Sequence, residues 1–176
     1  AYLAENKNDS LFYQILADKV YSCLSGSAKE LIPNLLNQLT GTFSSFSDVS
    51  FRSVFPFMSQ NIRSGALVFL ISDFHDLQQQ DFEFLSHLAQ KNTISLIHLY
   101  DEMETKMPEG VFPCSNRKQT VLMNTQNKSF KEKFQNSWVQ QTQLIRQNVQ
   151  KFGLGYLSLS TDSPYIQQFK SFCMGE

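Results

Sequence analysis

Three clusters of oxygen-bearing side chains stand at the ends of short apolar runs. Ser72 and Asp73 follow the run 66–71, Asp101 and Glu102 follow the run 94–100, and a third cluster, 160–162, closes the run 156–160. Unbroken apolar runs of this length are typical of parallel strands covered on both faces. The carboxyl ends of parallel strands meet at one edge of a sheet, where ligands bind. Because hard cations prefer carboxylate and hydroxyl oxygens, the sequence predicts an edge suited to one magnesium ion.

Each residue of these clusters also has a purely structural interpretation. Asp and Ser cap the helices that follow strands, and we expect this role for Asp76 and Asp162. Asp73 stands immediately at a strand end, so we favour a functional role for it. The other candidates for a binding edge are Ser72, His75, Asp101 and Glu104, together with Asp76.

The three histidines do not form a recognisable catalytic group. His75 lies in the stretch 73–76, where it could act as an acid, a base or a ligand. A single histidine without a partner is more often an exposed loop residue, and we interpret it so. His87 falls inside an expected helix and His98 inside an expected strand, which favours structural roles.

No sequence motif of the common nucleotide-binding or hydrolytic enzymes is present. The chain lacks G-x-x-x-x-G-K-[ST], G-x-G-x-x-G, G-x-S-x-G and H-E-x-x-H. The sequence thus gives no support to these motif-defined enzymes, and we expect a binding module rather than an enzyme. The alternative is a magnesium-dependent phosphoester hydrolase that uses Asp73, Asp76, Asp101 and Glu104 around the metal.

Length and composition indicate one α/β domain over residues 1–176. A chain of 176 residues with 41% hydrophobic residues can bury a sizeable core without stabilising disulfides or metal ions. Cys23, Cys114 and Cys173 are too far apart for a disulfide framework or a zinc site, so we expect reduced, mostly buried thiols. No apolar run approaches the roughly 18 residues of a membrane span. We expect a cytoplasmic protein with no membrane segment in this chain.

Charge is unevenly distributed along the chain. Residues 66–110 hold eight acidic and two basic side chains, whereas residues 116–151 hold seven basic and one acidic. Opposite patches on a small domain favour charged ligands or partners. The basic residues of the later segment are spread around one expected helix, which is typical of a solvated face, so we expect no nucleic acid partner.

The order of expected elements predicts a mainly parallel sheet between helices. Two short runs, 11–16 and 19–24, predict a hairpin, and Ser27 with Glu30 resembles a capping box before a helix. Helical periodicity follows over 51–62, where Pro56 should bend or interrupt the element. Strands 66–71, 94–100 and 156–160 alternate with helices, which implies right-handed crossovers. Short strands are expected near 111–113 and 120–123, followed by a long helix that Gly153 ends.

Two landmarks resemble a known family. The stretch Gly65-Ala66-Leu67-Val68-Phe69-Leu70-Ile71-Ser72-Asp73-Phe74 is similar to the signature strand of the family catalogued as domain of unknown function fifty-eight. The pattern Asp101-x-x-Glu104-x-x-x-Pro108-x-Gly110 resembles the second landmark of that family. The similarity extends more weakly to the hairpin and to Ser160-Thr161-Asp162, and so spans nearly the whole chain.

This resemblance implies a von Willebrand factor A-like, Rossmann-type fold that is incomplete at its N-terminus. Such domains bind partners through a metal-ion-dependent adhesion site built from three loops. The resemblance implies that Asp73 occupies the third loop and Ser47 the second, whereas the D-x-S-x-S of the first loop is absent from the sequence. Ala1–Asn6 instead resembles the end of the helix after that loop. We therefore expect Mg²⁺ in the complete domain and none bound tightly by this chain.

The resemblance also implies that the strand before the D-x-S-x-S loop, which would lie between the hairpin and the strand 66–71, is missing from the sequence. Its absence leaves strand edges that must be paired by the hairpin, by a neighbouring chain or by an upstream segment, so a homo-oligomer is possible through these edges. Family members are commonly paired with MoxR-type AAA+ ATPases. The resemblance thus implies a protein-interaction module that works with such an ATPase in the assembly or maturation of other proteins.

Overall fold

The computed structural model describes residues 10–16, 20–40, 50–115 and 120–175. The chain forms two compact units, Ala1–Gln60 and Asn61–Glu176, and each is described by itself. Ser47 and Ala1–Asn6, which the sequence analysis singled out, lie outside the described residues.

The first unit contains the predicted hairpin. Strand β1 (Ser10–Leu16) pairs antiparallel with β2 (Val20–Ser27), which confirms the expected pairing. Helix α2 (Ala28–Thr40) follows directly, and the Ser27 N–H donates to the Glu30 carboxylate over 3.4 Å, as one half of a capping box.

The second helical segment of this unit is interrupted, as expected from Pro56. A short 3₁₀-helix, η1 (Phe51–Val54), leads into α3 (Phe55–Asn61), and Pro56 is the second residue of α3. Proline is tolerated in a first helical turn because the N–H that it lacks has no intrahelical partner there. The Phe51 and Phe55 rings pack edge to face with centroids 5.8 Å apart.

The second unit is a mixed α/β structure built on a three-stranded parallel sheet. Its strands are β3 (Leu67–Ser72), β4 (Thr93–Tyr100) and β7 (Gly155–Ser160), in the order β3-β4-β7. Both pairings are parallel, which confirms the prediction that these three apolar runs lie side by side in one direction. Strand β4 is central, and its residues Ile94–His98 are all buried.

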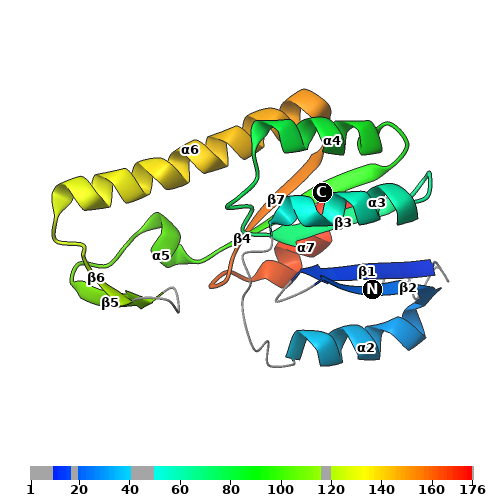
Figure 1. Cartoon of the computed structure of the whole chain (residues 1–176), viewed down its shortest axis with the longest axis horizontal. Helices are drawn as coiled ribbons and strands as arrows, with labels where there is room; N and C mark the ends of the chain where they lie inside the picture. The colour runs from blue at the N-terminus through cyan, green and yellow to red at the C-terminus, as the bar shows by residue number, and fades with distance from the viewer. Residues whose placement is uncertain (1–9, 17–19, 41–49, 116–119, 176) are drawn as a thin grey trace. The chain divides into compact units, whose positions relative to one another are not determined.

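Helices cover both faces of this sheet. Helices α4 (Gln79–Ala89) and α6 (Lys128–Phe152) contact each other and the strands, and Figure 1 shows them along one side of the sheet. On this face, the Trp138 ring of α6 lies 5.3 Å from the His98 ring of β4. Helix α7 (Tyr165–Met174) packs against part of the other face, where Phe169 contacts Phe69 with ring centroids 5.7 Å apart. Gly153, with φ 64°, ends α6 as predicted.

A small hairpin extends from the connection between β4 and α6. Helix α5 (Glu102–Thr105) leads to β5 (Val111–Ser115), which pairs antiparallel with β6 (Thr120–Asn124). Figure 1 shows this hairpin near the beginning of α6, away from the three-stranded sheet. Both short strands were expected from the sequence.

Burial differs from the sequence expectation at two places. Strand β3 was expected to be covered on both faces, but Leu67 and Ile71 are 59% and 60% exposed. The apolar run alone could not show this, because it does not reveal which neighbours cover the side chains of a strand. Cys114 is exposed and Cys173 is half-buried, so the expectation of mostly buried thiols is wrong for Cys114, which lies on the extended hairpin.

Candidate functional site

The parallel strands bring three polar clusters to one edge of the sheet. In the strand register, Ser72 of β3 lies beside His98 of β4, and Tyr100 of β4 lies beside Ser160 of β7. The residues that follow these strand ends therefore gather at the carboxyl edge, as the sequence predicts. We call the group Ser72, Asp73, Asp101, Glu104 and Thr161 the acidic edge.

Asp73 is held by a tight turn at the end of β3. Its Oδ1 accepts hydrogen bonds from the Ser72 hydroxyl and from the His75 N–H, both over 3.2 Å. The Ser72 hydroxyl in turn accepts the Phe74 N–H over 3.2 Å. Phe74 has φ 51°, a left-handed conformation that is uncommon for a bulky residue and occurs mostly in turns or at functional sites. The turn thus fixes the orientation of an exposed carboxylate.

Asp101 links the ends of β4 and β7. Its Oδ1 accepts the Met103 N–H over 2.7 Å and so caps α5. Its Oδ2 is 3.5 Å from the Thr161 hydroxyl, and the Thr161 N–H donates to the Tyr100 carbonyl over 3.0 Å. The cap fixes this second carboxylate at the same edge as Asp73.

The pKa of Glu104 is influenced by the other carboxylates of the acidic edge. Burial raises its pKa, and the negative charges of Asp73 and Asp101 raise it further. A backbone hydrogen bond involving Asp101 and the charge of His75 act in the opposite direction. The acidic edge therefore concentrates negative potential, and a cationic group bound there would relieve the repulsion.

His98 lies below this edge inside an aromatic cluster. It is 1% exposed, and its Nδ1 is 2.9 Å from the Tyr156 hydroxyl. Its ring also contacts Phe74, Tyr100 and Trp138. Burial lowers the pKa of His98, and the negative charge of Asp73 partly opposes this effect. Among the described residues its Nε2 has no hydrogen-bond partner. The packing agrees with the structural role expected for this histidine.

Helix α6 holds the turn that carries Asp73. The side-chain amide of Gln141 donates to the Phe74 carbonyl over 2.7 Å and to the Leu77 carbonyl over 3.1 Å. These bonds join residues more than sixty positions apart in the sequence. Sequence reasoning missed Gln141, because one glutamine among the many of this helix gives no signal of a distant partner.

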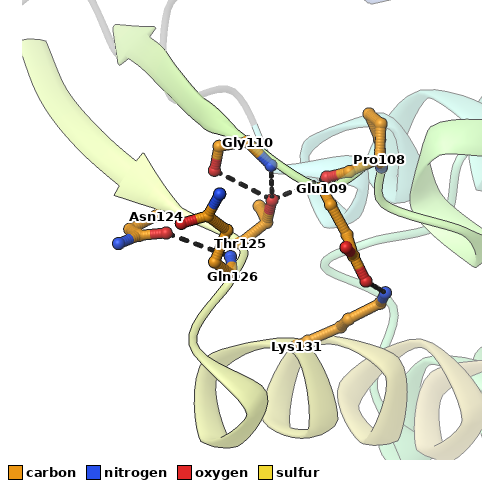
Figure 2. Close-up of polar contacts among 7 residues, drawn as sticks. All are labelled: Pro108, Glu109, Gly110, Asn124, Thr125, Gln126 and Lys131. Atoms are coloured by element: carbon orange, nitrogen blue, oxygen red, sulfur yellow. Dashed lines mark hydrogen bonds and ion pairs between the residues drawn. The ribbon is translucent and has the colours of Figure 1, made fainter.

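Thr125 closes the loop that carries the second landmark. Its side chain is 1% exposed, and its Oγ1 accepts the Gly110 N–H over 2.9 Å. The same hydroxyl can donate to the Pro108 carbonyl at 2.6 Å or to the Gly110 carbonyl at 3.0 Å (Figure 2). Figure 2 also shows the ion pair of Glu109 with Lys131 of α6, at 3.3 Å. The proline and glycine of the landmark are thus positioned by one buried hydroxyl, which the sequence analysis did not identify.

Other predicted site residues take different positions. His75 is exposed, as expected for a loop histidine. The expected capping by Asp76 is wrong, because α4 begins after Gln78, whose N–H donates to the Asp81 carboxylate over 2.8 Å. Asp162 does not cap α7 either, since Pro164 occupies the cap position. In both cases the helix begins later than the sequence suggests.

The predicted magnesium ligands are described only in part. Asp73 is within the described residues, whereas Ser47 is not. In the part of the chain that the structure describes, no three His, Cys, Asp or Glu side chains form a cluster that could hold a metal ion.

Comparisons with known proteins give little further information. No protein-family model matches the chain, and no curated protein matches it. A solved structure described as an uncharacterized membrane spanning protein from Vibrio fischeri is 11% identical, with 99% of this chain and 80% of that chain covered and a TM-score of 0.28. A TM-score this low supports no conclusion about fold or function. Over the described residues, no helix combines the length and apolar character that crossing a bilayer requires.

Proposed function

We propose that this chain is a protein-interaction module of the von Willebrand factor A type, as members of the family catalogued as domain of unknown function fifty-eight are. We further propose that it works with a MoxR-type AAA+ ATPase in the assembly or maturation of other proteins, and that the acidic edge is its partner-binding surface. The observation that carries the proposal is the gathering of Asp73, Asp101 and Glu104 where parallel strands end.

The geometry of these carboxylates favours recognition of a cationic surface. Asp73 and Asp101 are exposed, and each has one oxygen held by a local backbone N–H. Fixed, exposed carboxylates give electrostatic complementarity without a large entropic cost on binding. The partner surface should therefore present lysine or arginine side chains.

Metal binding is a separate part of this proposal. The resemblance implies that Mg²⁺ would be held by Asp73 and Ser47 in a complete domain, and we propose that this chain binds Mg²⁺ weakly. Titration calorimetry with magnesium chloride tests this, and saturable binding in the low micromolar range would contradict it.

The experiment measures binding to a purified MoxR-type ATPase from the same organism by biolayer interferometry. The variants Asp73→Asn and Asp101→Asn keep an oxygen that accepts the local N–H bonds but remove the charge. We expect each to weaken binding about tenfold, and binding to weaken as salt is raised. Glu83→Gln is the matched control, because Glu83 is exposed on α4 and lies outside the acidic edge.

Two results would contradict the proposal. Equal binding by Asp73→Asn, Asp101→Asn and the control would exclude the acidic edge as the partner surface. Magnesium-dependent hydrolysis of p-nitrophenyl phosphate that is lost in Asp73→Asn and kept in Glu83→Gln would instead support the phosphoester hydrolase.

A further inference from the structure

Strand β3 is an edge strand with the sequence of a central strand. Within the described part of the chain it pairs with β4 alone. Its sequence, Leu-Val-Phe-Leu-Ile-Ser, has no charged residue and no proline. Edge strands are normally protected from pairing by charges, prolines, bulges or short length. Strand β3 has none of the first three, so its free edge is suited to accept another strand.

The backbone groups at this free edge can be identified from the pairing with β4. The Thr93 N–H donates to the Ala66 carbonyl over 2.9 Å, and Leu67 is the register partner of Thr93. In a parallel ladder this pattern directs the N–H and C=O groups of alternate residues to the neighbouring strand. Ala66, Val68 and Leu70 therefore face β4, whereas Leu67, Phe69 and Ile71 direct their backbone groups to the free edge.

The side chains of the outward-bonding residues are exposed in a matching pattern. Leu67 is 59% and Ile71 is 60% exposed. Because they are four positions apart, they lie on the same face of the strand, on either side of Phe69. The other edge strand, β7, differs, since its side chains are all half-buried or buried. Strand β3 combines exposed apolar side chains with backbone groups that have no strand partner among the described residues. It is therefore the more favourable edge for pairing with another strand.

We propose that a second copy of this chain pairs with it through β3, in an antiparallel arrangement centred on Phe69. A two-fold axis at Phe69 places Leu67 of one copy opposite Ile71 of the other, so that each exposed residue covers its counterpart. Leu67, Phe69 and Ile71 are also the residues with free backbone groups, and this register forms about six interchain N–H···O bonds. The two parallel sheets then become one continuous sheet.

Charge at the ends of β3 supports the antiparallel arrangement of two copies. Arg63 precedes the strand and Asp73 follows it, and both are exposed. Antiparallel pairing brings the Arg63 end of one copy to the Asp73 end of the other, whereas parallel pairing would place like charges together. In the register centred on Phe69, Arg63 is diagonal to Asp73 of the second copy, within reach of a long side chain.

Sedimentation equilibrium of the full chain tests the proposal. We expect a monomer–dimer equilibrium for the natural sequence, and a dissociation constant raised at least about tenfold by Ile71→Lys or by Leu67→Lys, because a lysine blocks an edge. Leu122→Lys is the matched control, since Leu122 is 70% exposed on β6, outside the three-stranded sheet. This variant should dimerise normally. A natural chain that stays monomeric at about 100 µM, well above a micromolar dissociation constant, would overturn the proposal. Equal dimerisation of Ile71→Lys, Leu67→Lys and the control would also overturn it.

Disulfide formation tests the register. Chains carrying Leu67→Cys and chains carrying Ile71→Cys are prepared with the three natural cysteines replaced by serine. In this register the paired Cα atoms are about 5.5 Å apart, which suits a disulfide. We expect the mixture to form a crosslinked dimer on oxidation, and either chain alone to form much less. Equal crosslinking in the mixture and in the single chains would contradict the register.

Failure of this proposal can be told apart from failure of the proposed function. Dimerisation is measured on the chain alone, without the ATPase, and its variants change apolar residues of β3. The binding experiment changes Asp73 and Asp101 and reads a heterologous partner. A monomer that binds the ATPase would reject the dimer and leave the interaction module in place.

Discussion

The hydroxyl of Thr125 should determine the stability of the loop that carries the second landmark. In Thr125→Val the side chain keeps its shape but loses the hydroxyl, whose oxygen accepts the Gly110 N–H at 2.9 Å and whose O–H donates to the Pro108 carbonyl at 2.6 Å. The Gly110 carbonyl keeps a partner, because the Thr125 N–H also donates to it, over 2.9 Å. Valine therefore leaves one N–H and one C=O without a protein partner.

The expected loss follows from these two groups. Each part-buried group left without a partner costs about 1 to 2 kcal/mol, so Thr125→Val should destabilise the loop by about 2 to 4 kcal/mol. Thr125→Ser keeps the hydroxyl and loses one methyl group, at a cost of about 1 kcal/mol. Thr120→Val is a neutral control at an exposed position on the same hairpin, expected to change stability by less than about 0.5 kcal/mol.

Hydrogen exchange measured by mass spectrometry, together with urea unfolding, separates local from global effects. We expect amide protection over residues 108–115 and 120–127 to fall roughly 30- to 1,000-fold in Thr125→Val, since each 1.4 kcal/mol is a factor of ten. In Thr125→Ser the amide protection over these residues should fall about fivefold. If valine and serine lower protection equally, the hydroxyl does not hold the loop and the reasoning is wrong.

Two further predictions concern the core of the second unit. Burial lowers the pKa of His98, so the unfolded chain binds more protons below about pH 6.5 and the free energy of unfolding should fall as the pH drops from 7 toward the folded-state pKa. Urea midpoints measured between pH 7.5 and 5 test this, and a slope unchanged in His98→Phe would contradict it. In Gly155→Ala the new Cβ would collide with the Ser95 hydroxyl and lie 3.0 Å from the Ser95 Cβ, which should cost about 1 to 3 kcal/mol. The melting temperature lost in Gly155→Ala should be recovered in part when Ser95→Gly is added. If it is not, the destabilisation does not come from the contact with Ser95.

The sequence determined the order and type of most elements in this protein. The apolar runs 66–71, 94–100 and 156–160 end in polar clusters and alternate with helical periodicity, and these patterns follow from backbone geometry and burial alone. Glycine at a left-handed position ended α6 where expected, at Gly153. The predicted parallel direction then followed from the short, right-handed connections that such an order permits.

The tertiary structure decided which side chains meet. Gln141 reaches the Phe74 and Leu77 carbonyls, and Thr125 reaches Pro108 and Gly110, because folding brings together segments with no shared local pattern. The exposure of Leu67 and Ile71 likewise depends on what packs against β3, since an apolar run is the same whether its side chains are covered or not. Local periodicity encodes which face of an element is apolar, whereas the neighbour of that face is fixed only when the chain has folded.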